Sequence, residues 1–146
     1  MTLKKALTSV LAVALLAGGT LALTAFRGHH DPARFDRFVS HRIDDMLDDV
    51  HATDAQRQKI GAIRDRLLAD AKTLHAGRGD AVKALLAQWQ ADRPDAARVH
   101  AVVDGRADAM KRFADEVSDA VLQVHGILTP EQRAQITKKL QRRVEE

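Results

Sequence analysis

The segment between Pro94 and Gly126 constrains the fold more than any other part of the sequence. Along it, apolar residues recur at alternating spacings of four and three positions. This is the seven-residue repeat of helices that pack along a narrow seam. Gly105 interrupts the segment, but a helix tolerates a single glycine. We therefore predict one long, nearly straight helix of roughly 50 Å. Its predicted seam consists of Val103, Ala107, Met110, Ala114, Val117, Val121, Val124 and Leu128.

The segments on either side of it carry helical patterns too. Asp31-Pro32 is a typical helix start with proline in the first position, and the apolar residues that follow predict a helix of about four turns. A second helix is expected to begin at Thr53, and Ala76-Gly-Arg-Gly79 predicts a break before a short third helix. Thr129 begins the last helix. The sequence therefore predicts an all-α fold of four to five amphipathic helices, one of them long.

The predicted apolar stripes are thin for helices of this length. A single chain of this kind would bury little apolar surface, and small cores give marginal stability. A homodimer that covers the exposed stripes is the simplest remedy, and a compact monomeric bundle is the alternative.

The N-terminal residues have the pattern of an export signal. MTLKK is followed by an uncharged run over residues 6–26 and then by the polar sequence RGHHDPA. We favour a cleaved signal peptide, although a run of about 20 apolar residues also suffices for an uncleaved membrane anchor. In both cases the chain divides into a signal or anchor (1–26), a polar linker (27–33) and a helical domain (34–146), and this domain is expected in the periplasm. Because the chain has no cysteine, an oxidising compartment leaves it unchanged.

The charge balance narrows the range of partners. The formal net charge is +3, but Lys4 and Lys5 account for two of the 23 basic residues, so residues 27–146 carry 21 basic and 20 acidic side chains. A domain balanced in this way does not attract nucleic acid by bulk charge. The polar helix faces mix Asp with Arg, whereas helices that lie on lipid have a face rich in Lys and Arg. We therefore expect no nucleic-acid partner, and contact with a membrane only through an uncleaved N-terminus.

The sequence holds no recognisable catalytic constellation. After the apolar run the only serines are Ser40 and Ser118, and both lie within predicted helices rather than at a nucleophile elbow. Cysteine chemistry is excluded, no H-E-x-x-H occurs, and Gly77-Arg-Gly79 is too short for a phosphate loop. We expect a protein that is not an enzyme and that requires no cofactor.

Histidine and aspartate residues form a candidate metal site. Four Asp within six residues lie near the C-terminal end of the first predicted helix, where like charges and the helix dipole are unfavourable, so a cation is expected beside them. One interpretation is a divalent transition metal held by His and Asp. The other is ion pairing with basic residues of the next helix, namely Arg57, Lys59, Arg64 and Arg66. The candidate metal ligands are His29, His30, His41, Asp44, Asp45, Asp48 and His51.

Two of the predicted helix starts share one pattern. The pattern is Thr-x-x-Gln, at Thr53 to Gln56 and at Thr129 to Gln132. In such a capping box the Thr hydroxyl accepts a hydrogen bond from the backbone N–H of the Gln, and the Gln side chain accepts one from the backbone N–H of the Thr. Leu128 precedes the second copy, whereas Ala52 stands at this position in the first. Together with the export signal, the absence of cysteine and the helical body, the pair resembles the LTxxQ-motif family of periplasmic proteins over residues 34–143. That family includes Spy/CpxP chaperone-like proteins and zinc resistance-associated and heavy-metal sensor relatives.

The resemblance implies an antiparallel, cradle-shaped homodimer whose concave face binds unfolded or partly folded envelope proteins without ATP. The leading functional expectation is therefore a periplasmic holdase or refolding chaperone of the envelope stress response. The alternative is a periplasmic sensor or buffer of the same fold for zinc, nickel, cobalt or copper. A regulator that binds a sensor kinase or another envelope protein is the third expectation.

Overall fold

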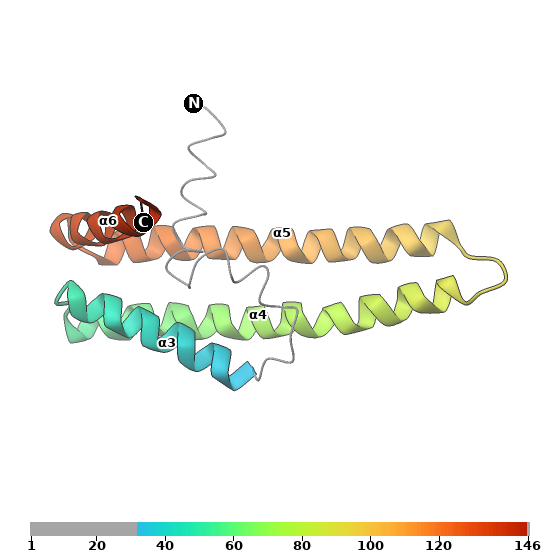
Figure 1. Cartoon of the computed structure of the whole chain (residues 1–146), viewed down its shortest axis with the longest axis horizontal. Helices are drawn as coiled ribbons and strands as arrows, with labels where there is room; N and C mark the ends of the chain where they lie inside the picture. Colours follow the sequence, from blue (N-terminus) through green and yellow to red (C-terminus); the bar gives the residue numbers. More distant parts are fainter. Residues whose placement is uncertain (1–31, 146) are drawn as a thin grey trace, which may run out of the picture. The chain divides into compact units, whose positions relative to one another are not determined.

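The computed structural model describes residues 32–145 and, within them, the side chains of residues 34–142. The described residues form four helices: α3 (Pro32–Asp49), α4 (Asp54–Trp89), α5 (Ala96–Ile127) and α6 (Pro130–Glu145) (Figure 1). No strand occurs in residues 32–145, so the predicted all-α class is confirmed. None of these four helices combines the length and the apolar character needed to cross a bilayer. The predicted signal or anchor and most of the linker, with His29 and His30, lie outside the described residues.

A residue in the left-handed conformation ends α3. The His51 N–H donates to the Asp48 carbonyl (3.0 Å) and the Ala52 N–H donates to the Leu47 carbonyl (2.9 Å), the Schellman arrangement of a helix C-terminus. His51 has a φ of 51°. Ala52 then packs in the same buried cluster as Leu47, so the turn leads directly from the core into the start of α4.

The second helix, α4, is continuous through the sequence whose glycines predict a break. It extends over 36 residues and includes Gly77 and Gly79. The prediction of a separate short helix is therefore wrong, and residues 32–145 form two long helices, α4 and α5, rather than one. Glycine costs a helix interior only about 1 kcal/mol relative to alanine, which packing can offset. Beside Gly77 lies Arg106 of α5, whose guanidinium donates a 2.6 Å hydrogen bond to the Leu74 carbonyl.

The third helix, α5, confirms the long helix predicted after Pro94. It has 32 residues. The Asp95 carboxylate caps its first turn by accepting the N–H groups of Ala97 (2.9 Å) and Arg98 (3.2 Å). The Gln88 side-chain oxygen accepts the Asp95 N–H (2.9 Å), which ties the end of α4 to the start of α5.

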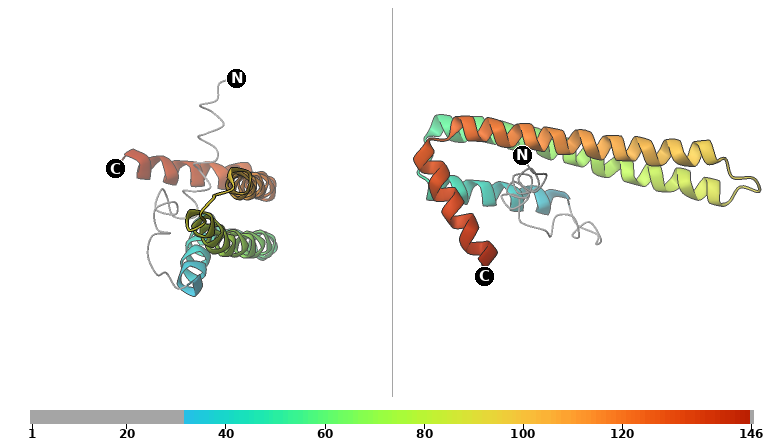
Figure 2. Two further views of the ribbon diagram at one scale, coloured as in Figure 1. Left: turned by 90° about the vertical axis from the view of Figure 1, so that its right-hand side faces the viewer. Right: turned by 90° about the horizontal axis from the view of Figure 1, so that it is seen from above.

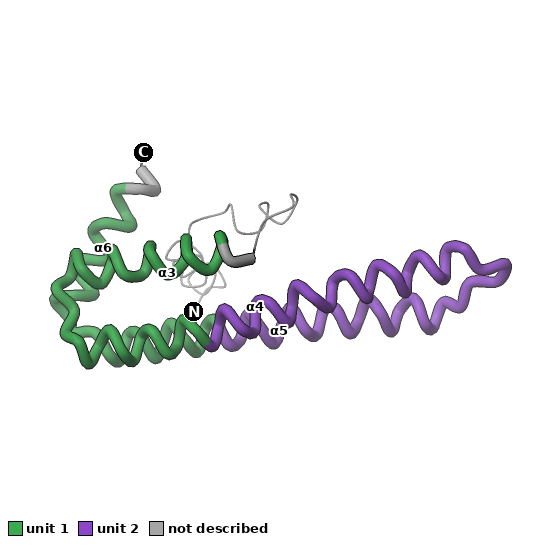
Figure 3. Tube along the Cα trace, turned by 90° about the horizontal axis from the view of Figure 1, so that it is seen from below, with its two compact units in different colours: residues 1–65, 117–146 green, residues 66–116 purple. Residues whose placement is uncertain are grey.

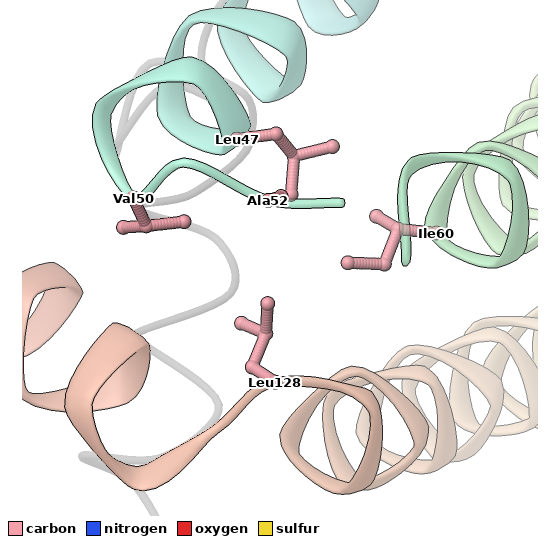
Figure 4. Packing of buried hydrophobic residues seen from close by; sticks show 5 residues of the cluster. All are labelled: Leu47, Val50, Ala52, Ile60 and Leu128. Atoms are coloured by element: carbon pink, nitrogen blue, oxygen red, sulfur yellow. The ribbon is translucent and has the colours of Figure 1, made fainter. Parts of the chain in front are cut away.

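The chain forms two compact units (Figure 3). Among the described residues, the first unit contains 32–65 and 117–145, and the second contains 66–116. In the second unit the later part of α4 and the earlier part of α5 run side by side in opposite directions (Figure 2). The first unit holds a buried apolar cluster, formed by Leu47, Val50, Ala52, Ile60 and Leu128 (Figure 4).

The half-buried side of α5 differs from the predicted seam within the second unit. Val103 and Met110 of the predicted seam are 51% and 50% exposed, and Ala107 and Ala114 are exposed as well. The half-buried positions in this stretch are Val99, Val102, Arg106, Ala109 and Phe113. From Val117 onwards, in the first unit, the predicted seam residues are half-buried or buried. The predicted register is therefore wrong for the first half of α5 and confirmed for the second.

The register error has a physical cause. Spacings of three and four fit two neighbouring stripes of α5, and the sequence does not state which of them a neighbouring helix covers. Burying the stripe that contains Phe113 removes more apolar area from water than burying one that contains two alanines. The four residues Val103, Ala107, Met110 and Ala114, called the outer α5 stripe below, consequently stay exposed in the single chain.

Candidate functional site: the paired Thr-x-x-Gln motifs

Each Thr-x-x-Gln motif forms a complete capping box. At the start of α4, the Thr53 N–H donates to Gln56 Oε1 (2.9 Å) and the Gln56 N–H donates to Thr53 Oγ1 (3.3 Å). At the start of α6, the Thr129 N–H donates to Gln132 Oε1 (2.9 Å) and the Gln132 N–H donates to Thr129 Oγ1 (3.3 Å). Each box satisfies two backbone donors that a helix start otherwise leaves unpaired. The two boxes have the same geometry.

The two glutamine side chains also bond to each other. Gln56 Nε2 donates to Gln132 Oε1 (2.9 Å), and Gln132 Nε2 donates to Gln56 Oε1 (3.1 Å). The second hydrogen of each amide reaches a carbonyl at the end of another helix, Ile127 for Gln56 (2.9 Å) and Val50 for Gln132 (3.3 Å). Gln132 is only 9% exposed, and no buried side-chain polar atom in the described residues lacks a partner. This full pairing offsets the cost of burying the amides.

An arginine directly after each glutamine extends the motif. Arg57 Nε donates to the Ala52 carbonyl (3.1 Å), and an Arg133 guanidinium nitrogen donates to the Leu128 carbonyl (2.7 Å). Each arginine therefore reaches back to the residue that precedes the threonine. The shared Thr-x-x-Gln-Arg spacing is visible in the sequence, but its role is visible only in the structure.

Ala52 and Leu128 occupy matching places in the two copies. Both are buried, at 8% and 5% exposure, and both belong to the apolar cluster of the first unit. Leu47 and Val50 of α3 pack in the same cluster. The position before the threonine is therefore buried in both copies, although it is alanine in the first copy and leucine in the second.

The acidic cluster of α3 lies against basic side chains. Asp48 contacts Arg57 at 2.7 Å and Asp44 contacts Arg64 at 3.5 Å, and Lys139 of α6 pairs with Asp49. Within the first unit, Asp44 and Asp48 therefore take the ion-paired arrangement that the sequence offers as one of its two interpretations.

The candidate metal ligands are only partly brought together. His41 Nδ1 lies 3.5 Å from Asp45 Oδ1, with both side chains exposed. His51 is exposed in the turn after α3. No group of three or more His, Asp or Glu side chains with metal-binding geometry occurs in the described part of the chain. Because zinc takes four ligands, the described residues alone do not complete a zinc site.

Glu131 adds a charge to the second capping box. Hydrogen bonds from its own backbone N–H and from the Thr129 side chain lower the pKa of the Glu131 carboxyl. A carboxylate in the first turn also suits the positive end of the helix dipole. The α6 cap is therefore strongest when Glu131 is ionised.

The motif geometry agrees with the comparison to known families. Residues 38–140 match the family model described as LTXXQ motif family protein. No curated protein and no solved structure matches the chain significantly. The match extends from α3 into α6 and includes both capping boxes, so the chain belongs to the LTXXQ motif family.

Proposed function

We propose that the protein is a periplasmic, ATP-independent chaperone that holds partly folded envelope proteins. Membership of the LTXXQ family supports this class of function together with a metal-related alternative. The sequence contains no phosphate-binding loop, so the proposed activity depends on binding surfaces alone.

The exposed apolar side chains of the second unit carry the proposal. Five of the seven large apolar side chains that are exposed in the described residues belong to this unit. On α4 they are Val82 (47% exposed), Leu86 (53%) and Trp89 (85%), which we call the outer α4 stripe. Spacings of four and three place them along one side of the helix. We infer that this row of exposed apolar side chains is the surface that contacts a client protein.

The charges around this stripe suit a client that must later leave. Lys83 pairs with Asp80 and Arg98 pairs with Asp95, and all four side chains are more than half exposed. Exposed ion pairs contribute about 0 to 1 kcal/mol each, so they can exchange partners with a client at little cost. Weak contacts spread over a helix surface let a client fold while it is bound.

A homodimer is part of the proposal. The outer α5 stripe keeps its four-three spacing and remains exposed in the single chain. Helices with such a stripe pair along it, and small residues such as Ala107 and Ala114 allow close approach. A second copy of the chain is the simplest partner, because it brings the same stripe.

Aggregation of reduced lysozyme tests the proposed function. The client aggregates when its disulfides are reduced, and the reductant leaves this protein unchanged because the chain has no cysteine. We expect the exported protein to suppress light scattering at near-stoichiometric ratio without ATP. Undiminished scattering would refute the chaperone proposal.

Two matched variants locate the activity. Leu86→Ser with Trp89→Ser removes most of the outer α4 stripe and is expected to abolish suppression. Gln58→Ser lies on α4 in the first unit, at an exposed position outside the outer α4 stripe, and should retain suppression. Because all three side chains are exposed, the variants should unfold at the wild-type temperature within a few degrees.

Metal binding is the second candidate function. The observation that favours it is the exposed pair of His41 and Asp45, which offers two oxygen or nitrogen donors one helical turn apart. Further ligands would have to come from His29 and His30 or from another molecule. Titration calorimetry with zinc chloride should then detect binding that is lost in His41→Ala. Absence of heat, or unchanged binding after the substitution, would rule this function out.

A further inference from the structure

The exposed face of α3 is divided into a basic and an acidic half. Helical spacing places Arg34, Arg37 and Phe38 together in the first half, and we call these three residues the α3 basic face. All three are exposed, and Phe38 is 54% exposed. The opposite side of the helix carries Val39 and Leu47, which are buried at 6% and 1% exposure. This burial fixes which side of α3 faces outward.

Three of the four carboxylates in the acidic half pair with cations of other helices, and the fourth, Asp45, lies beside His41, whereas the basic half forms no such pair with a described residue. Asp44, Asp48 and Asp49 contact Arg64, Arg57 and Lys139 respectively. Neither Arg34 nor Arg37 forms an ion pair with any residue in the described range, and the first turn of α3 has no acidic residue. No carboxylate of the described residues therefore competes with an external anion for the α3 basic face.

An exposed phenylalanine between two arginines matches the chemistry of a lipid surface. Arginine binds headgroup phosphates, and an aromatic ring enters the boundary between headgroups and acyl chains. The sequence argues against lipid contact because its polar faces mix Asp with Arg. In the first half of α3, Asp36 is half-buried, and the exposed positions from 34 to 40 are Arg34, Arg37 and Phe38, so the exposed surface there carries cations and no carboxylate.

The position of α3 in the chain favours the same occupant. Seven residues, 27–33, separate the uncharged run 6–26 from Arg34. Seven residues span at most about 25 Å, so a chain retained at the membrane by this run would keep α3 close to the headgroups. We propose that the α3 basic face docks on an anionic phospholipid surface.

Tryptophan emission from position 38 tests the proposal. Trp89 is the only tryptophan, so Phe38→Trp in a Trp89→Phe background gives a single local reporter in the full chain. We expect its emission to shift to shorter wavelength with phosphatidylglycerol vesicles and not with phosphatidylcholine vesicles. The comparison holds even if residues 6–26 insert into both, because only the anionic surface attracts the arginines.

Charge variants of the reporter protein define the mechanism. Arg34→Gln with Arg37→Gln should weaken binding to the anionic vesicles about 25-fold, since each basic residue near such a surface contributes about fivefold. Lys83→Gln with Arg98→Gln removes two exposed charges from the second unit and should leave the shift unchanged. Equal emission with both kinds of vesicle would overturn the proposal. An emission shift that needs no lipid and grows with protein concentration would also overturn it, because it would identify a second copy of the chain as the occupant. An emission shift that appears only with reduced lysozyme would do the same, because it would identify a client protein as the occupant.

Discussion

Gln132 joins three helices of the first unit through one amide group. Its oxygen accepts hydrogen bonds from Thr129 and Gln56, and its nitrogen donates to Gln56 and to the Val50 carbonyl. These contacts link the ends of α3, α4 and α6 at a single buried point. The family motif is therefore a structural clamp that holds the turns of the first unit, and the proposed client surface lies elsewhere.

A double-mutant cycle on the two glutamines tests this clamp. Gln132→Leu leaves the Gln56 amide without its partner, and we expect the free energy of unfolding in urea to fall by about 2 to 3 kcal/mol. The double variant Gln56→Leu with Gln132→Leu should lose about 1 kcal/mol less than the sum of the single losses, because each single change already breaks the shared bonds. Gln135→Leu, at an exposed position of α6, is the control and should change stability by less than about 0.5 kcal/mol. Additive losses would show that the pair does not act as one unit.

Glu131 makes the α6 cap sensitive to pH. The pKa of its carboxyl is lowered from the ordinary value of 4.5 by hydrogen bonds to its own N–H and to Thr129. Its contribution to stability is therefore complete above pH 4.5 and is lost as the pH falls through the lower pKa of the folded state. Thermal unfolding between pH 3 and pH 7 should show a smaller loss of stability on acidification for Glu131→Gln than for the wild type. Parallel curves would contradict this role.

At the scale of helices, the α4 glycines mark a place where stability can be gained. Beyond the local backbone of α4, no neighbouring atom lies within 4 Å of the place that a Cβ would take at Gly79, so Gly79→Ala fits without rearrangement. Because alanine is a better helix former, the free energy of unfolding should rise by about 1 kcal/mol, and the variant should unfold at a higher temperature. Unchanged or reduced stability would indicate that α4 is not a regular helix there.

The same elements show what the sequence could predict and what it could not. The two capping boxes depend on residues three positions apart, and their Thr-x-x-Gln spacing is sufficient to predict them. The bond between Gln56 and Gln132 joins residues 76 positions apart, so no local pattern reveals it. The continuity of α4 and the register of α5 depend on what each helix packs against, such as Arg106 beside Gly77, and local propensity does not contain that information.

At the scale of the whole molecule, the homodimer is the property that the exposed stripes predict. Ala107→Glu with Met110→Glu places charges on the outer α5 stripe, and sedimentation equilibrium should show a change from dimer to monomer. Arg112→Glu, at an exposed position outside the stripe, is the matched control and should remain dimeric. A wild-type protein that sediments as a monomer would contradict the prediction, as would a dimer that survives both substitutions.

Direct contact with a client is the most immediate test of the proposed chaperone function. A photoreactive amino acid at position 86, within the outer α4 stripe, should crosslink to lysozyme while the client is being reduced and not to native lysozyme. The same group at exposed position 58 in the first unit should give little product. Strong crosslinking from position 86 alone is the result we predict. Equal crosslinking from both positions, or none from position 86, would contradict the assignment of client binding to the second unit.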